Sequence, residues 1–289
     1  EVQQPQYGPS DPNAAAAELW RIIAPDLAED WIIPYAALFL GISKNTTITD
    51  DSGITKAAFV SERQRLLKTF SETHLKKPDI TPFTIALIDS GEPQALSLLE
   101  KIATENPDEA TQGIAALGAA MLLKSLGDEP ELMAKRLNFL REAIIKSADQ
   151  IIAGTSVADI ASDELYVIRY LTKGREAPPL SGTDVAARPV KLSDFKGRMV
   201  ILLFWDAKTE ATDQIIQLTN QLATKYRDQP VTVLGVTPES AERIRTLQGD
   251  GSILWNNISD PTEKLTKEYR INNRPAVFVI DAQGKIQFT

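Results

Sequence analysis

The sequence predicts two domains of different class, an all-helical domain followed by an α/β domain. The chain has 289 residues, which is long for a single domain. Apolar residues recur at helical spacing through the first 173 residues, whereas short continuous apolar runs alternate with helical segments afterwards. We therefore predict a flexible N-terminal segment over residues 1–12, a helical domain over 13–173 and an α/β domain over 174–289.

The first domain reads as a series of helical hairpins. Helical segments of similar length are separated by short breaks such as Asn106-Pro107 and Gly127-Asp128. A run of small residues between positions 115 and 120 would let two helices approach closely, which loosely resembles tetratricopeptide-type hairpins. A solenoid and an irregular bundle both remain open, and the absence of a clean repeat of 34 residues favours the bundle.

Charge is distributed unevenly between the two halves. The whole chain carries a net charge of -8, with 16 Lys and Arg against 25 Asp and Glu in residues 1–173. The remaining residues are close to neutral, with 15 basic against 14 acidic side chains. An acidic surface repels phosphate backbones, so we predict that the protein does not bind nucleic acid.

The composition excludes several kinds of chemistry. The sequence contains no cysteine and one histidine, His74, so thiol catalysis and zinc sites built from several His or Cys ligands are excluded. We predict no metal, no cofactor and a surface position for His74, which lies in a polar helix end. No uninterrupted apolar run reaches about 18 residues, so no membrane-spanning helix is expected.

The second half contains a strand–helix–strand pattern. Residues 199–205 form a continuous apolar run, residues 212–226 have helical spacing, and residues 231–236 form a second apolar run. A third run at 276–281 is followed by the turn Ala282-Gln283-Gly284-Lys285 and by a last strand, and the pattern Asp-x-x-Gly between the two runs predicts a hairpin. The first two strands are expected to be parallel, because a crossover helix connects them.

Four short motifs occur in this half, and their order along the chain is informative about the fold. They are the sequence Gly-x-x-Ala-Pro at 174–178, the segment Leu192-Ser193-Asp194-Phe195-Lys196-Gly197, the strand end Phe204-Trp205, and Tyr269-x-Ile271 followed by Arg274-Pro275. Together they cover about 115 residues and resemble the TlpA/redoxin-like (AhpC/TSA) branch of the thioredoxin superfamily. The resemblance implies a thioredoxin-like α/β sandwich with a central mixed sheet. The helix that usually ends such domains has no counterpart before Thr289.

The resemblance also locates a degenerate redox site. In that family a Cys-x-x-Cys motif follows the Phe-Trp pair, and by spacing Thr209 and Thr212 occupy the two cysteine positions here. The family's cis-proline, which faces the dithiol, corresponds to Pro275. Thiol–disulfide exchange needs a thiolate and a second sulfur, and peroxidase chemistry of this family also starts from a thiolate. Threonine supplies neither, so the resemblance implies ancestry rather than redox activity.

We therefore predict a non-catalytic binding or assembly module whose partner is a peptide or protein. Its predicted groove lies beside the proline loop, with Trp205, Lys208, Arg274 and Pro275 as a mildly basic and aromatic rim. Ordinary surface is the competing interpretation of this rim, and it is the favoured one. Core packing is likewise favoured for Trp205 and Trp255.

Two alternatives to this function are kept. One is membership of a thiol-disulfide oxidoreductase or antioxidant family by ancestry. The other is a cysteine-free enzyme that uses the acidic turn at 206–213, although acidic residues and threonine there fit a helix N-terminus.

TlpA-like domains are mostly extracytoplasmic in bacteria, and the methionine-free start agrees with a removed signal peptide, so an extracytoplasmic location is expected. Neither an oligomeric state nor a specific ligand follows from the sequence.

Overall fold

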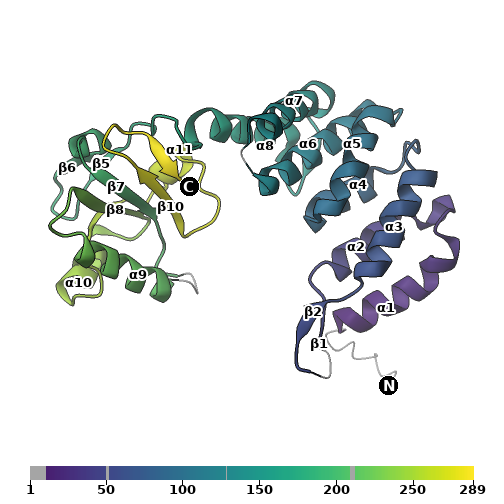
Figure 1. The fold of residues 1–289 in the computed structure, drawn as a ribbon, viewed down its shortest axis with the longest axis horizontal. Coiled ribbons are helices and arrows are strands. Elements are labelled where there is room, and N and C mark those ends of the chain that lie inside the picture. Colours follow the sequence, from purple (N-terminus) through teal and green to yellow (C-terminus); the bar gives the residue numbers. More distant parts are fainter. Residues whose placement is uncertain (1–10, 50–51, 128, 209–211) are drawn as a thin grey trace, which may run out of the picture. The chain divides into compact units, whose positions relative to one another are not determined.

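The structure is a computed structural model that describes residues 11–49, 52–127, 129–208 and 212–289. Its contacts divide the chain into two compact units, Glu1–Glu164 and Leu165–Thr289 (Figure 1). Helix α8, Val157–Tyr166, and the following π-helical turn η4, Val167–Leu171, contain the change from one unit to the other. Leu171 is buried in the core of the second unit, so the contacts change before the domain boundary that the sequence predicts at 173/174.

The first unit is helical, as the sequence predicts. Two short hairpins accompany the helices, formed by β1 (Thr47–Thr49) with β2 (Thr55–Ala57) and by β3 (Ile151–Ile152) with β4 (Thr155–Ser156). In the part of the chain that the structure describes, no helix has the length and apolarity to cross a membrane. The helices before α8 are α1 (Pro12–Ile23), α2 (Ile33–Ser43), α3 (Val60–Thr73), α4 (Thr81–Ser90), α5 (Leu96–Glu105), α6 (Glu109–Leu126) and α7 (Pro130–Ser147).

Helix α6 forms the centre of this unit because its side chains are small. The Asp108 side chain caps its first turn by accepting a hydrogen bond from the Thr111 backbone at 2.8 Å. Helices α4, α5 and α7 all pack against α6. The approach is closest at Gly113 and Gly118, where an added Cβ would lie 2.3 Å from Ser147 Oγ and 2.5 Å from an Ile88 side-chain carbon respectively. The run of small residues therefore does what the sequence predicts, which is to bring helices close together.

His74 is buried, and the predicted surface position is wrong. Its Nε2 atom lies 2.8 Å from the carbonyl oxygen of Leu27, and its ring lies 4.5 Å from that of Phe70. The Nδ1 atom lies 3.6 Å from a carboxylate oxygen of Asp30. The polar residues around His74 in sequence suggested an exposed helix end, but the segment after α1 folds over this end and supplies a partner for the imidazole.

The second unit is built on a mixed five-stranded sheet with the strand order β11-β10-β7-β8-β9. Strands β7, β8 and β9 are parallel, whereas β10 runs antiparallel to both β7 and β11. This confirms the predicted α/β domain with a central mixed sheet. The strands are β5 (Ser181–Thr183), β6 (Pro189–Lys191), β7 (Met199–Phe204), β8 (Val231–Thr237), β9 (Asn256–Ser259), β10 (Ala276–Ile280) and β11 (Ile286–Phe288), with helices α9 (Thr212–Lys225), α10 (Ala241–Gly249) and α11 (Lys264–Glu268).

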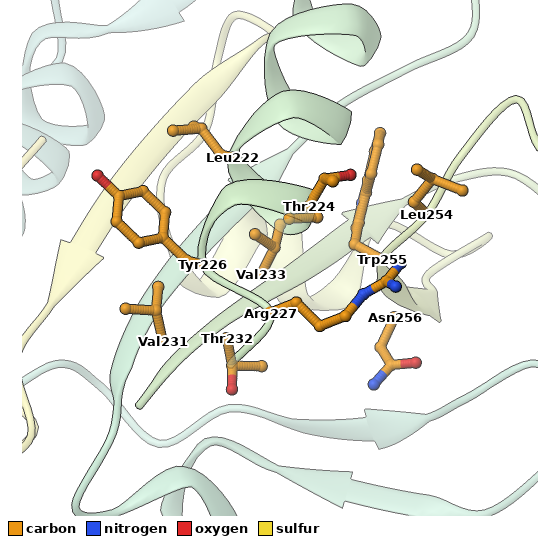
Figure 2. Close-up of a pocket in the computed structure, with 11 residues that line it drawn as sticks. Leu222, Thr224, Tyr226, Arg227, Val231, Thr232, Val233, Leu254, Trp255 and Asn256 are labelled. Atoms are coloured by element: carbon orange, nitrogen blue, oxygen red, sulfur yellow. The ribbon is translucent and has the colours of Figure 1, made fainter. Parts of the chain in front are cut away.

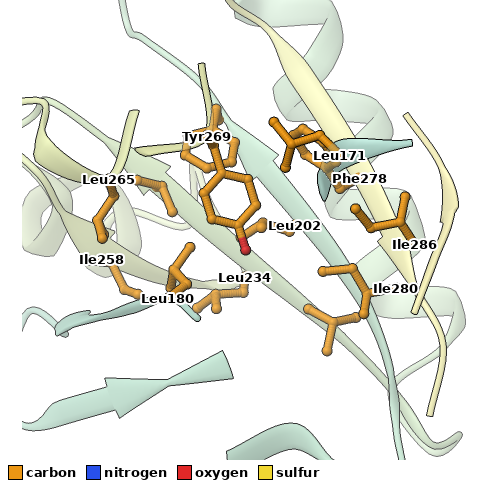
Figure 3. Close-up of a cluster of buried hydrophobic side chains, with 13 residues drawn as sticks. Leu171, Leu180, Leu202, Leu234, Ile258, Leu265, Tyr269, Phe278, Ile280 and Ile286 are labelled. Atoms are coloured by element: carbon orange, nitrogen blue, oxygen red, sulfur yellow. The ribbon is translucent and has the colours of Figure 1, made fainter. Parts of the chain in front are cut away.

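Strand β7 has apolar side chains on both faces, and a separate core covers each face. Leu202 and Phe204 point into a core that also contains Tyr269, and Figure 3 shows the side chains of this core converging. Leu203 and Trp205 belong to the core on the other face. The Tyr269 hydroxyl donates a hydrogen bond to the Pro178 carbonyl at 2.7 Å, and burial raises the pKa of Tyr269, so this donor stays protonated.

Candidate functional site

The loop after β7 and the Arg274–Pro275 peptide meet at one end of the sheet. The register of β7 and β10 places Phe204 opposite Ala276, so the residues that follow Phe204 lie beside those that precede Ala276. The Arg274–Pro275 bond is cis, as the resemblance implies, and Pro275 is exposed. The fold therefore brings the predicted site segments together, although they are separated by about 70 residues in sequence.

Arg274 does not form a basic rim, because two carboxylates neutralise it. Its Nη1 lies 3.8 Å from Asp206 Oδ2, and its Nη2 lies 3.0 Å from Glu263 Oε1. The Nη2 group also donates to Thr266 Oγ1 at 3.2 Å. Only 15% of the Arg274 side chain is exposed, so the guanidinium is held in place by these partners. The predicted mildly basic surface is thus close to neutral around this residue.

A buried aspartate organises the partners of Arg274. Asp260 accepts hydrogen bonds from the backbone and the hydroxyl of Thr266, at 3.1 and 3.2 Å, and it is 5% exposed. These bonds fix the start of α11, and Thr266 in turn contacts Arg274. Sequence reasoning missed Glu263 and Thr266 as site residues. The signal that could have found them is the Asp260-Pro261 helix start, which places several polar side chains just upstream of the proline loop.

Trp205 is fully buried and therefore is not part of a groove rim. Its ring lies 6.1 Å from that of Trp255 at a steep angle, and its Nε1 group donates to Asn257 Oδ1 at 2.9 Å. Trp255 Nε1 also donates to this oxygen, at 3.2 Å. Trp205 follows the alternation of β7 into the core around Leu203, so the packing interpretation is correct for both indoles.

Lys208 is exposed at the predicted site, and its backbone N–H donates to Asp206 Oδ1 at 2.8 Å. Thr209, one of the two degenerate cysteine positions, lies outside the described residues, as do Glu210 and Ala211. Thr212 is the first residue of α9, but its side chain is not described. Of the acidic turn at 206–213, the structure thus describes Asp206, bound by Arg274, and the exposed Asp213 at the start of α9.

A separate hollow of 260 Å³ lies at the other end of the parallel strands. It is lined by the end of α9, by the starts of β8 and β9, and by loop residues next to them, including Tyr226, Arg227 and Trp255 (Figure 2). The register pairs Val231 with Met199 at the start of β7, whereas the predicted site follows the end of β7. This hollow is therefore not the predicted site. Among the described residues, no group of three or more His, Asp or Glu side chains is arranged to hold a metal ion.

Comparison with known proteins agrees with this architecture. Residues 173–289 match the model of the AhpC/TSA family. The chain is 26% identical over 124 residues to thiol-disulfide oxidoreductase ResA of Bacillus thuringiensis subsp. konkukian, a match that covers 40% of this chain and 72% of that protein. It is 27% identical over 130 residues to the chloroplastic peroxiredoxin Q of Sedum lineare, which covers 42% and 69% respectively.

The chain is also similar to solved structures over part of its length. The crystal structure of the thioredoxin domain of a thiol-disulfide oxidoreductase from Bacteroides vulgatus is 26% identical, with a TM-score of 0.36, and covers 40% of this chain and 86% of its own. The mixed sheet, the family match and the sequence relatives together show that residues 173–289 form a thioredoxin-like redoxin domain of the AhpC/TSA type, with no cysteine in its sequence.

Proposed function

We propose that this protein is a redox-inactive, thioredoxin-like binding or assembly module whose partner is a peptide or protein. The observation that carries the proposal is the cis Arg274–Pro275 peptide beside the loop after β7, in a chain without cysteine. Pro275 still lies beside the loop after β7, yet none of the 289 residues is a cysteine. Because thiol exchange and thiol peroxidase chemistry both require a thiolate, binding is the family property that this chain can retain.

The surface around Pro275 favours recognition through the main chain. Pro275, Lys208 and Asn273 are exposed there, whereas Trp205 is buried and Arg274 is neutralised. An extended peptide can pair with exposed backbone at such a position and needs few specific side-chain contacts. We therefore propose recognition by backbone pairing and shape, in place of the basic and aromatic rim expected from sequence.

Neither alternative function is favoured by a specific observation. The oxidoreductase and peroxiredoxin activities named for the relatives describe those proteins, and we propose that they are ancestral for this chain. Of the described carboxylates in the acidic turn, Asp206 is engaged by Arg274 and by the Lys208 backbone, and the exposed Asp213 begins α9, where an acidic side chain is typical of a helix N-terminus. We also propose an extracytoplasmic location from the resemblance to TlpA-like domains. Recovery of the native protein from the cytoplasmic fraction of its cells would contradict that location.

Peptide binding at the Pro275 surface is tested by charge reversal of an exposed neighbour. The full chain and its Lys208→Glu variant are screened on a random peptide array, and selected peptides are titrated by calorimetry. We expect the affinity for the selected peptides to fall by about tenfold, or roughly 1.4 kcal/mol, in this variant, because a carboxylate beside the paired strand repels the peptide's main-chain carbonyl oxygens whichever side chains the peptide carries. Lys196→Glu is the matched control, since it makes the same charge change before the start of β7, at the opposite end of the strand. Equal affinity of wild type and Lys208→Glu, or equal loss in both variants, would contradict binding at this surface.

The assignment of Thr209 and Thr212 to the lost cysteine positions predicts a gain of function. The double variant Thr209→Cys with Thr212→Cys is expected to form an intramolecular disulfide on mild oxidation and to reduce insulin slowly, because the two positions would again face Pro275. Thiol titration should detect two thiols per chain after reduction and none after oxidation. The single variant Thr209→Cys is the control and should keep its one thiol. A double variant that oxidises only between chains would show that these positions are not adjacent.

A further inference from the structure

The first unit has an apolar groove that the thioredoxin-like domain does not explain. It has a volume of 720 Å³ and is formed by α2, α4 and α6, with the β3–β4 hairpin and Ile160 of α8 at its margin. Figure 1 shows α2, α4 and α6 following one another along the unit, and the three helices pack in that order. Its lining is almost wholly aliphatic and includes Leu38, Ile42, Leu117 and Met121.

Helix α2 has an apolar face that the described part of the first unit leaves exposed. The helix carries no charged residue from Ile33 to Ser43, a composition that is typical of a helix buried on all sides. In the structure only one side is buried, and Leu38 is 52% exposed on the other. Tyr35, Leu38 and Ile42 are spaced three and four residues apart and share that exposed face. Trp31, which is 46% exposed and packs edge-on against Tyr35, extends the apolar strip beyond the groove.

The electrostatic surroundings point to the chemistry of the occupant. The first unit has 14 Lys and Arg against 25 Asp and Glu, a net charge of -11. Asp89 lines the groove but is paired with Lys44, so the exposed Asp159, adjacent to Ile160, supplies the negative charge at its margin. The lysines on the groove helices are already paired, Lys44 with Asp89 and Lys124 with Glu164 at 2.7 Å. An apolar strip with an acidic margin is complementary to an apolar face that is bordered by basic residues.

We infer that the α2–α4–α6 groove binds an amphipathic helical segment of a partner protein, with apolar residues at spacings of three and four and Lys or Arg on its flanks. The apolar strip continues past the groove to the exposed Tyr35 and Trp31, and this length favours an elongated helical occupant over a small molecule. Leu38 on α2 is 52% exposed and Met121 on α6 is 40% exposed. Both line the groove, so a helix bound between α2 and α6 can contact both side chains.

The test uses the full chain and a fluorescent peptide of about 18 residues, long enough for five helical turns. Leucines at spacings of three and four residues form one face of the peptide. Lysines and alanines fill the remaining positions. Fluorescence anisotropy is expected to show saturable binding with a Kd of about 1–10 μM. A scrambled peptide of identical composition, with no apolar face, should bind at least about tenfold more weakly. A version of the peptide with glutamate in place of lysine should also bind about tenfold more weakly than the lysine peptide.

Groove variants locate the binding. Leu38→Lys and Met121→Lys are each expected to weaken binding of the patterned peptide by about tenfold. Each variant adds to the apolar strip a positive charge that repels the lysines of the peptide. Both positions are exposed, so the urea midpoint should stay unchanged. Ile145→Lys on α7 is the control, because Ile145 is 81% exposed and does not line the groove. The inference is overturned if scrambled and patterned peptides bind equally, if the glutamate peptide binds as well as the lysine peptide, or if Ile145→Lys loses as much as the groove variants. It is also overturned if sedimentation shows a wild-type dimer that Leu38→Lys dissociates, because a second copy would then cover the groove.

Discussion

Replacing Asn257 with leucine is expected to destabilise the thioredoxin-like domain by about 3 kcal/mol, because two buried donors lose one shared acceptor. Asn257 Oδ1 accepts from Trp205 Nε1 at 2.9 Å and from Trp255 Nε1 at 3.2 Å, and all three residues are buried. Leucine has the same branched arrangement of side-chain heavy atoms but no acceptor, and an unpaired buried donor costs about 1–3 kcal/mol. Urea denaturation with hydrogen-exchange mass spectrometry over residues 199–289 measures the effect and assigns it to this domain.

The neighbouring residue of the same strand is the control for this variant. Asn256 is exposed, so Asn256→Leu should change stability by less than about 0.5 kcal/mol. Gly235→Ala tests the same oxygen from the adjacent strand, since an added Cβ would lie 1.9 Å from Asn257 Oδ1. We expect it to destabilise the domain as Asn257→Leu does. If amide hydrogen exchange over residues 199–289 is no faster in Asn257→Leu than in wild type, the indoles have other acceptors and the Asn257 amide does not hold them in place.

Replacing Arg63 with methionine is expected to destabilise the helical unit by about 3 kcal/mol, since it removes one partner of a largely buried ion pair. Arg63 is 5% exposed and pairs with Glu92, whose side chain is 18% exposed. Its Nη1 group also donates to the carbonyl oxygens of Ser43 and Ala58, at 2.9 and 2.8 Å. The variant leaves a carboxylate and two carbonyl groups without this donor. Thermal unfolding followed by hydrogen exchange over residues 11–164 measures the loss.

Lys68→Met on the same helix provides the matched control. Lys68 is exposed, so removal of its charge should leave the unfolding temperature nearly unchanged. The double variant Arg63→Met with Glu92→Leu should recover part of the lost stability, because it no longer leaves a charge without its partner. A double variant that is less stable than the sum of both single changes would show that the pair itself is not the source of the effect.

The elements of the second half could be predicted from sequence because each leaves a local signal. The apolar run at 199–205 predicts β7, the helical spacing at 212–226 predicts α9, and the run at 276–281 predicts β10. The order of these elements with the family motifs is enough to predict a mixed sheet. Because the two site segments each follow or precede one of these strands, their meeting at one sheet end could also be expected.

The side-chain arrangement of the site could not be predicted in the same way. Arg274 was expected to be a free cation, but Glu263 reaches it from a loop eleven residues earlier, a contact that no periodicity reveals. Trp205 directly follows a strand with apolar side chains on both faces, so the sequence alone does not decide whether the indole faces a core or a groove. His74 was misplaced for a related reason, since its partner is the carbonyl of Leu27, 47 residues away. Local pattern predicts elements, whereas these contacts depend on which distant loop covers which surface.

The ion pairs of Arg274 with Asp206 and Glu263 have a kinetic consequence for any partner of the thioredoxin-like domain. With its charge balanced by Asp206 and Glu263, this end of the sheet has no concentrated field of one sign to attract a charged partner from a distance. Encounter there should proceed near the unsteered rate of about 10⁵–10⁶ M⁻¹s⁻¹ and should hardly respond to ionic strength. Differences in affinity between partners would then lie almost entirely in how slowly each complex dissociates.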